Sequence, residues 1–327
     1  MKPIYKILAA TLFVALCTTA FFAFRKTGQY KRAHNPQRQV FLYELNPSVA
    51  VNANNFPSLV QKIAGSNFKA LKQEKTETGQ RFTSSDPSEY YEVSEGQGRF
   101  SFSKSLSRYM GNYKPSLPDP KAAQQLAMNF LKENKLMAES QDEMQLIHSG
   151  GLRADDENGN VIDKMITLTY GRVIGGVPVI GSGSKIVVHI GEKGEVMGVI
   201  RNWKAYTTKR ELGAKEVKTA AEMEREFQAL VITQFGKEAK AEIKRSYMVY
   251  FDNGGKYLQP VMAYETTVNV MNAAGQSQQL PYLGIIEAMR NPAEKLNLTR
   301  VDPAGLRFIN ANKVSPDNKP KPLDKED

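Results

Sequence analysis

Residues 170–200 constrain the possible fold of this chain more than any other stretch. They begin with the sequence YGRVIGGVPVIG and continue into two apolar segments that meet at the turn Lys193-Gly194. In both segments every second residue is apolar or glycine, which is the period of a strand with one buried face. Gly194 supplies the positive φ that a tight hairpin turn needs. The stretch therefore predicts three short strands, and it shows no pattern of a nucleophile, a metal cluster or a phosphate loop.

The same residues resemble the PepSY-like modules found in thermolysin and fungalysin propeptides. The shared pattern is an aromatic residue (Tyr170), five residues, Gly-Val-Pro-Val-x-Gly, an alternating strand and Gly-x-Val. Counting the helix before the strands, the resemblance covers about residues 119–206. The resemblance implies a helix packed on a small antiparallel sheet, in a module that chaperones or inhibits a protease. The chain has no His-Glu-x-x-His motif, so the resemblance is to the accessory module standing alone, without a peptidase domain.

Changes in hydrophobic period divide the chain further. Asp119 before Pro120 predicts the start of a capped helix, and Thr219 with Glu222 forms a capping box before a second one. We expect an α+β protein of two to three PepSY-like modules, each a helix packed on a small antiparallel sheet. The expected divisions are a transmembrane anchor or signal peptide (1–24), a basic linker (25–38), an N-terminal α+β module (39–114), the PepSY-like module (115–210), a helix-plus-hairpin module (211–290) and an extended tail (291–327) that is disordered after about 314.

The N-terminal segment predicts contact with a membrane. Residues 7–24 carry no charge and are just long enough to span a bilayer. Cleavage after Ala20 would leave an unfavourable Phe-Phe-Ala-Phe terminus, which favours an uncleaved anchor over a signal peptide. The basic residues of 25–38 favour a cytoplasmic body, whereas the resemblance implies an extracytoplasmic one. We expect a membrane-anchored protein with its body outside the cytoplasm, or a secreted or periplasmic protein if the signal is cleaved.

Composition excludes several classes of function. The net charge is +10, but the basic residues form no stripe with interleaved aromatics, so no nucleic-acid partner is expected. Cys17 is the only cysteine, and it lies in the apolar N-terminal run. The three histidines, His34, His148 and His189, are far apart in the sequence and lack the spacing of a metal site. We expect no catalytic residue, no cofactor and no metal.

Five residues are candidates for binding a protein partner. Val177, Pro178 and Val179 form the segment whose proline removes a ladder hydrogen bond, which indicates a sheet edge or a bulge where a partner can dock. His189 interrupts an apolar strand on the face opposite Val188 and is expected to be exposed. Trp203 is the fifth candidate, with core packing as its alternative role.

These observations favour a non-enzymatic, extracytoplasmic binding or regulatory protein. Its partner would be a protease, which it inhibits or chaperones, or a membrane signalling protein. The alternative is a cell-envelope hydrolase whose site is assembled from dispersed residues. A third interpretation is an envelope protein that binds a ligand in a cleft between modules.

Overall fold

The computed structural model describes residues 39–46, 51–94, 98–155, 159–271 and 277–296. These residues form two compact units. The first contains the described residues up to Val217 together with Met248–Val261 and Ala288–Glu294, and the second contains Lys218–Tyr247, Met262–Glu287 and the described residues from Lys295. The expected anchor and linker (1–38) and the tail from residue 297 lie outside the described residues.

Two α-helices lie in the described part of the first unit. Helix α2 spans Phe56–Ala64, and helix α3 spans Pro120–Glu133. The side chain of Asp119 accepts hydrogen bonds from the backbone N–H groups of Lys121 and Ala122, so the predicted cap of α3 is confirmed. Both helices turn their apolar residues toward a sheet that carries the predicted strands of residues 177–202.

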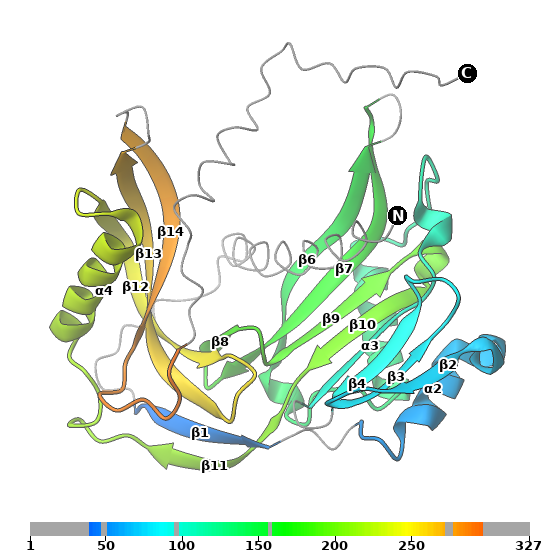
Figure 1. The fold of residues 1–327 in the computed structure, drawn as a ribbon, viewed down its shortest axis with the longest axis horizontal. Coiled ribbons are helices and arrows are strands. Elements are labelled where there is room, and N and C mark those ends of the chain that lie inside the picture. Colours follow the sequence, from blue (N-terminus) through cyan, green and yellow to red (C-terminus); the bar gives the residue numbers. More distant parts are fainter. Residues whose placement is uncertain (1–38, 47–50, 95–97, 156–158, 272–276, 297–327) are drawn as a thin grey trace. The chain divides into compact units, whose positions relative to one another are not determined.

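The strands join into one mixed sheet of fourteen (Figure 1). They are β1 Phe41–Asn46, β2 Lys72–Lys75, β3 Gly79–Thr83, β4 Tyr90–Ser94, β5 Arg99–Ser103, β6 Met144–Asp155, β7 Val161–Ile174, β8 Val177–Gly181, β9 Lys185–Ile190, β10 Val196–Asn202, β11 Ala205–Glu211, β12 Lys240–Asp252, β13 Tyr257–Met271 and β14 Ser277–Glu287. Their order is β11-β1-β13-β12-β8-β7-β9-β10-β5-β4-β3-β2, with β14 beside β13 and β6 beside β7. Strands β8 and β12 run parallel, which makes the sheet mixed.

The predicted fold class is therefore wrong. Instead of two or three small modules, each with its own antiparallel sheet, the described residues form one large mixed sheet with three α-helices. The physical reason is edge pairing. Strand β5 pairs with β10, with Phe102 opposite Val199, so the strands of residues 39–114 and 115–210 share one sheet. Changes in hydrophobic period locate helices and strands, but they do not report which strand edges meet.

One core lies between α2, α3 and this part of the sheet. Phe56 of α2 packs close to Phe82 and Phe100, while Leu131 of α3 belongs to the same buried cluster. Alternation along the strands places Phe100 and Phe102 on the helix-covered face and Arg99 and Ser101 on the other. Both helices therefore lie on one face of the same set of strands.

The second unit contains the third helix, α4, over Ala220–Phe235. Its predicted capping box is confirmed, because the Thr219 backbone N–H donates to Glu222 at 2.7 Å and the Glu222 N–H donates to Thr219 Oγ1 at 3.3 Å. On the sheet side of α4 the ring of Phe227 stacks on that of Tyr264, with centroids 4.5 Å apart. The unit thus contains α4, which packs on β13 and β14, together with residues of β12.

Candidate functional site

The segment predicted to be a docking edge is an interior strand. Strand β8 pairs antiparallel with β7, where Pro178 lies opposite Val173, and parallel with β12, where Val179 lies opposite Tyr250. The edge prediction is therefore wrong. The missing N–H of Pro178 is tolerated because pairing with β12 begins only at the following residue, Val179.

Burial removes the central residue of this segment from the surface. Val179 is 2% exposed and belongs to a buried cluster with Tyr43, Ile174 and Tyr250. Val177 packs against the same cluster and is partly buried, as is Pro178. In this fold, the side chain of Val179 has no surface to offer to a partner.

The turn that follows β8 is held by a buried aspartate. Ser184 Oγ donates to Asp252 Oδ2 at 2.6 Å, and the Gly183 N–H donates to the Asp252 carbonyl at 3.0 Å. A Cβ on Gly183 would lie 2.1 Å from the Asp252 carboxyl group, so this position requires glycine. Asp252 also accepts a hydrogen bond from the Gly254 N–H at 2.8 Å. These contacts fix the end of β8 against β12.

Trp203 is buried in the core, which agrees with core packing, the alternative to a role in partner binding. The guanidinium of Arg172 lies over the indole at 4.4 Å and donates to the Lys204 carbonyl at 2.6 Å. Arg172 Nε is 3.3 Å from a carboxylate oxygen of Glu143, and both side chains are buried. Burial lowers the pKa of Arg172 and raises that of Glu143. A buried ion pair of this kind has a structural role in holding β7 to the segment before β6.

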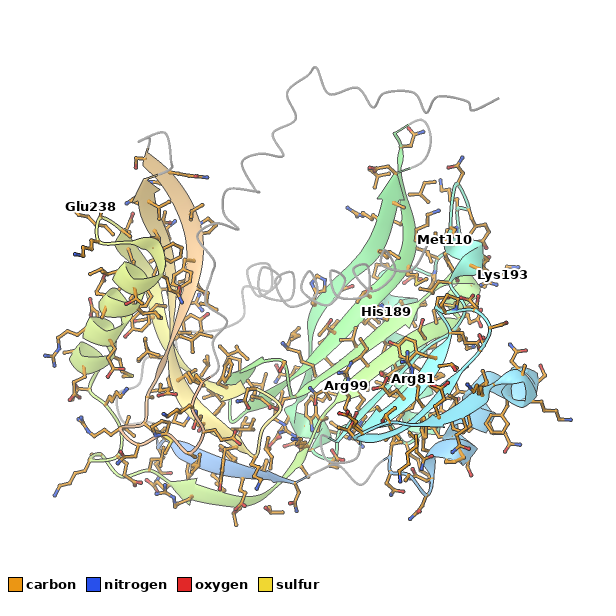
Figure 2. All side chains as sticks on the ribbon, in the orientation of Figure 1. Arg81, Arg99, Met110, His189, Lys193 and Glu238 are labelled. Atoms are coloured by element: carbon orange, nitrogen blue, oxygen red, sulfur yellow. The ribbon has the colours of Figure 1, made fainter. Side chains whose placement is uncertain are left out.

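His189, which is labelled in Figure 2, is partly buried rather than exposed. It lies on β9 opposite Thr167 of β7, whose Oγ1 is 3.1 Å from His189 Nδ1. Burial lowers the pKa of His189 to about 4. His148 lies on β6 with its ring over Gly150, and burial lowers its pKa too. Within the described ranges no group of three His, Cys, Asp or Glu side chains is placed to hold a metal, and His34 lies outside those ranges.

Strand β6 is an edge that the sequence interpretation did not single out. Among the described residues it pairs with β7 alone, over eleven of its twelve residues with Ile147 left out at a register shift, and Figure 1 shows the two strands side by side. Residues 144–152 carry no charged side chain. The available signal was this uncharged run of residues 144–152, which lacks the charges and the proline that usually protect a sheet edge.

The other sheet edges carry more charge or a proline, whereas β6 has charged residues only at its end, Arg153 and Asp155, after the uncharged residues 144–152. All four residues of β2 are exposed, and three of them are charged. Strand β11 ends with Lys209, Arg210 and Glu211, and β14 contains Pro281. Charges and proline are the usual means by which an edge avoids pairing with another strand. The tip of the β6–β7 hairpin instead exposes apolar side chains, with Leu152 39% and Val161 63% exposed.

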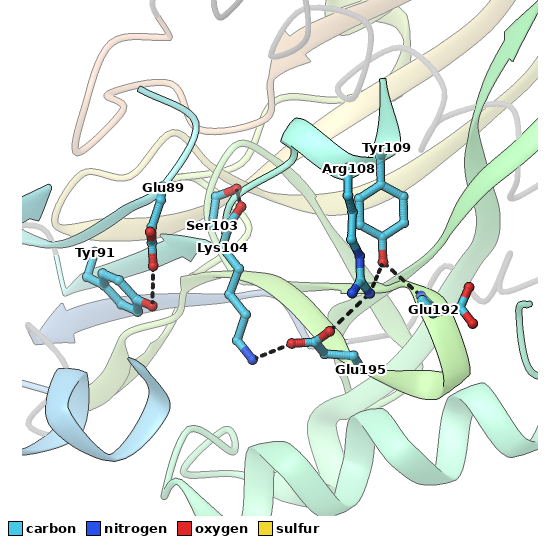
Figure 3. Close-up of polar contacts among 8 residues, drawn as sticks. All are labelled: Glu89, Tyr91, Ser103, Lys104, Arg108, Tyr109, Glu192 and Glu195. Atoms are coloured by element: carbon cyan, nitrogen blue, oxygen red, sulfur yellow. Dashed lines mark hydrogen bonds and ion pairs between the residues drawn. The ribbon is translucent and has the colours of Figure 1, made fainter. Parts of the chain in front are cut away.

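A polar cavity of about 360 Å³ lies elsewhere in the first unit. Its walls come from four places: the 3₁₀ turn Gly65–Ala70 after α2, the start of β4, the segment after β5, and the start of β10. The charged residues that line it are Glu89, Lys104, Arg108 and Glu195 (Figure 3). Lys104 Nζ is 2.9 Å from one Glu195 oxygen, and Arg108 Nη2 is 3.2 Å from the other.

A buried tyrosine forms part of the cavity wall. The Tyr91 hydroxyl donates to Glu89 at 3.4 Å, which is long for an O–H···O hydrogen bond. Burial, and then the nearby negative charge of Glu89, raise the pKa of Tyr91, so its hydroxyl stays protonated. Ser105 and Ser107 add hydroxyl groups 2.9 Å apart to the same wall. The cavity thus combines charges of both signs with neutral donors and acceptors.

Comparisons with known proteins add little to these observations. No protein-family model matches the chain, and no curated protein matches its sequence. Among solved structures, the chain is similar to an uncharacterized protein from Eubacterium rectale ATCC 33656, with a TM-score of 0.46 and 11% identity over 80% of this chain and 86% of that one. The PepSY-like resemblance stays a prediction. In the described part of the chain no helix is long and apolar enough to span a bilayer, and residues 7–24 fall outside that part.

Proposed function

We propose that the chain is a non-enzymatic, extracytoplasmic binding protein that regulates a protease or a membrane protein by pairing its β6 edge with an extended strand of that partner. The observation that supports this is the long edge of β6, whose first nine residues carry no charged side chain. The proposal includes anchoring by residues 7–24, either as an uncleaved helix or, if the segment is cleaved, as a signal peptide.

The chemistry of a free edge explains the choice. Along β6 the backbone N–H and C=O groups that point away from β7 have no strand to pair with among the described residues. An added strand binds through these main-chain groups, and the side chains beside them supply specificity. Leu152 and Ser149 are exposed on this strand and would contact the incoming segment. A partner segment with small or apolar side chains and no run of charges fits the uncharged residues 144–152.

Site-specific photo-crosslinking in cells tests the proposal. A photoreactive residue replaces Ser149 on the β6 edge, and in a matched protein it replaces Gln73, which is exposed on the charged β2 edge. We expect one specific partner to be linked from position 149 and not from position 73. The absence of any linked protein at 149, or the same products from both edges, would contradict the proposal.

A further inference from the structure

We propose that the cavity between the 3₁₀ turn Gly65–Ala70 and the starts of β4 and β10 binds a small zwitterion of dipeptide size, with its ammonium group against Glu89 and its carboxylate against Lys104 and Arg108. This inference does not depend on the β6 proposal, because the two sites share no residue.

Glu89 forms the negative end of the cavity. The residue is 9% exposed and lines the cavity wall. No ion pair from a described lysine, arginine or histidine reaches its carboxylate, and Tyr91 makes only the long contact of 3.4 Å. A buried carboxylate without a cation is costly in free energy. A ligand ammonium group in the cavity would remove that cost.

Lys104 and Arg108 form the positive end. Their two positive charges are matched within the cavity by the single carboxylate of Glu195, which each of them contacts through a different oxygen. One positive charge is therefore left over on this side, whereas one negative charge is left over at Glu89. A ligand with a cation at one end and an anion at the other neutralises both. Because Lys104 and Arg108 keep part of their surface exposed, they have donors available for a ligand carboxylate.

The volume of the cavity and the uncharged residues in its wall indicate the class of ligand. A volume of about 360 Å³ is at the small end of known ligand sites, which suits a dipeptide rather than a drug-sized molecule. Asn67, Ser105 and Ser107 line the cavity between or beside the charged groups and offer hydrogen bonds to a peptide amide. Met197 and Ala64 are the aliphatic residues that line the wall. The site therefore favours a peptide with small side chains and free termini.

Isothermal titration of the full-length protein, kept in a non-ionic detergent, tests this assignment. The probe is L-alanyl-L-alanine, compared with its N-acetyl derivative, its C-terminal amide and free alanine. Each blocked derivative loses one charge-assisted contact and should bind about tenfold more weakly or worse. Alanine is too short to reach both ends and should bind more weakly than the dipeptide.

Variants assign each terminus to its residue. In Glu89→Gln, dialanine and N-acetyl-dialanine should bind equally, because the group that distinguishes them is gone. In Arg108→Gln, the preference for the free carboxylate over the amide should shrink in the same way. Glu92→Gln is the matched control, since Glu92 lies on the same strand as Tyr91 but is not in the cavity wall. It should bind all the probes as the unaltered protein does.

The outcome that overturns the inference is equally specific. Dialanine that gives no saturable heat, or that binds no better than its blocked derivatives, excludes a dipolar site. Equal binding of alanine contradicts the dipeptide size. An unchanged preference in Glu89→Gln, with circular dichroism showing a folded variant, removes Glu89 from the site. None of these results bears on crosslinking at β6.

Discussion

Strands β6 and β8 are both neighbours of β7, yet they differ in what they can contact. Strand β8 is short, contains Pro178 and is paired on both sides, by β7 and by β12. Strand β6 spans Met144–Asp155 and is paired, among the described strands, on one side only. A proline in a strand indicates an edge, because it has no backbone N–H to donate to a neighbouring strand. In β8 the pairing with β12 begins one residue after Pro178, so the missing N–H does not prevent β8 from lying inside the sheet. Edge status thus depends on topology more than on the residues of the strand itself.

Val179→Lys on β8 should give the largest effect of any substitution considered. Val179 is buried among Tyr43, Ile174 and Tyr250, so a lysine there would leave an unpaired ammonium group in the core. We expect the free energy of unfolding to fall by about 4 kcal/mol. Urea denaturation followed by circular dichroism measures the change. A variant with unchanged stability would show that β8 is peripheral and would restore the docking interpretation.

Asp252→Ala should give the next largest loss. The change leaves the Ser184 hydroxyl and the Gly254 N–H without the oxygens that accept their hydrogen bonds, in a buried turn. We expect a loss of about 2–3 kcal/mol in the free energy of unfolding. Asp163→Ala is the control, because Asp163 forms an exposed ion pair with Arg153 and should lose at most about 0.5 kcal/mol. Similar losses in both variants would contradict a special role for the turn after β8.

The histidines beside β7 predict a dependence of stability on pH. The folded pKa of His189 is about 4, whereas an unfolded histidine titrates near 6.5. Between these values the unfolded state binds more protons, so the free energy of unfolding falls as the pH falls from about 6.5 to about 4. After a discount for partial exposure, we expect His189 to account for about 2 kcal/mol of this fall.

His189→Gln should flatten the pH dependence in urea denaturation between those two pH values. His148→Gln is the companion variant, because burial also lowers the pKa of His148 and the two contributions have the same sign. Subtracting the variant curves from that of the unaltered protein separates the histidines from the carboxylates that titrate below pH 5. If the slope is unchanged in His189→Gln, then His189 is more solvated than its position on β9 implies.

Leu152→Lys should give the smallest effect on stability and yet decide the function. Leu152 is exposed on the β6 edge, so the free energy of unfolding should change by at most about 0.5 kcal/mol. A lysine on the edge opposes the addition of a strand, and partner binding should weaken by about tenfold. The yield of crosslinks from position 149 measures this. Val161→Lys adds the same charge near the hairpin tip on the paired strand β7 and should leave the yield unchanged. An equal loss of crosslink yield in both variants would indicate that the added positive charge itself weakens partner binding, and would contradict strand pairing at the β6 edge.

The sequence predicted the local elements well and their assembly poorly. Asp119 and Thr219 gave the starts of α3 and α4, because caps act within one turn of a helix. The β8–β12 pairing joins Val179 to Tyr250, and no short-range pattern records a contact over such a distance. The cavity could not be predicted from the sequence for the same reason, because Glu89, Arg108 and Glu195 come from separate segments. The edge at β6 was in principle visible as the uncharged run 144–152, but it needed the topology to show that β6 has one neighbour among the described strands.

The pairing of β1 has a consequence for the time course of folding. Tyr43 of β1 pairs with Lys209 of β11 and with Leu258 of β13, so its second neighbour is synthesised more than two hundred residues later. At ribosomal rates of ~5–20 residues per second, this interval lasts roughly 10–40 s. Until β11 is made, the segment that begins Phe41-Leu42-Tyr43 has neither strand neighbour, and after that its β13 side stays unpaired until the end of the interval. The first strand of this protein is therefore among the last to be completed, and a holding chaperone would have its longest opportunity there.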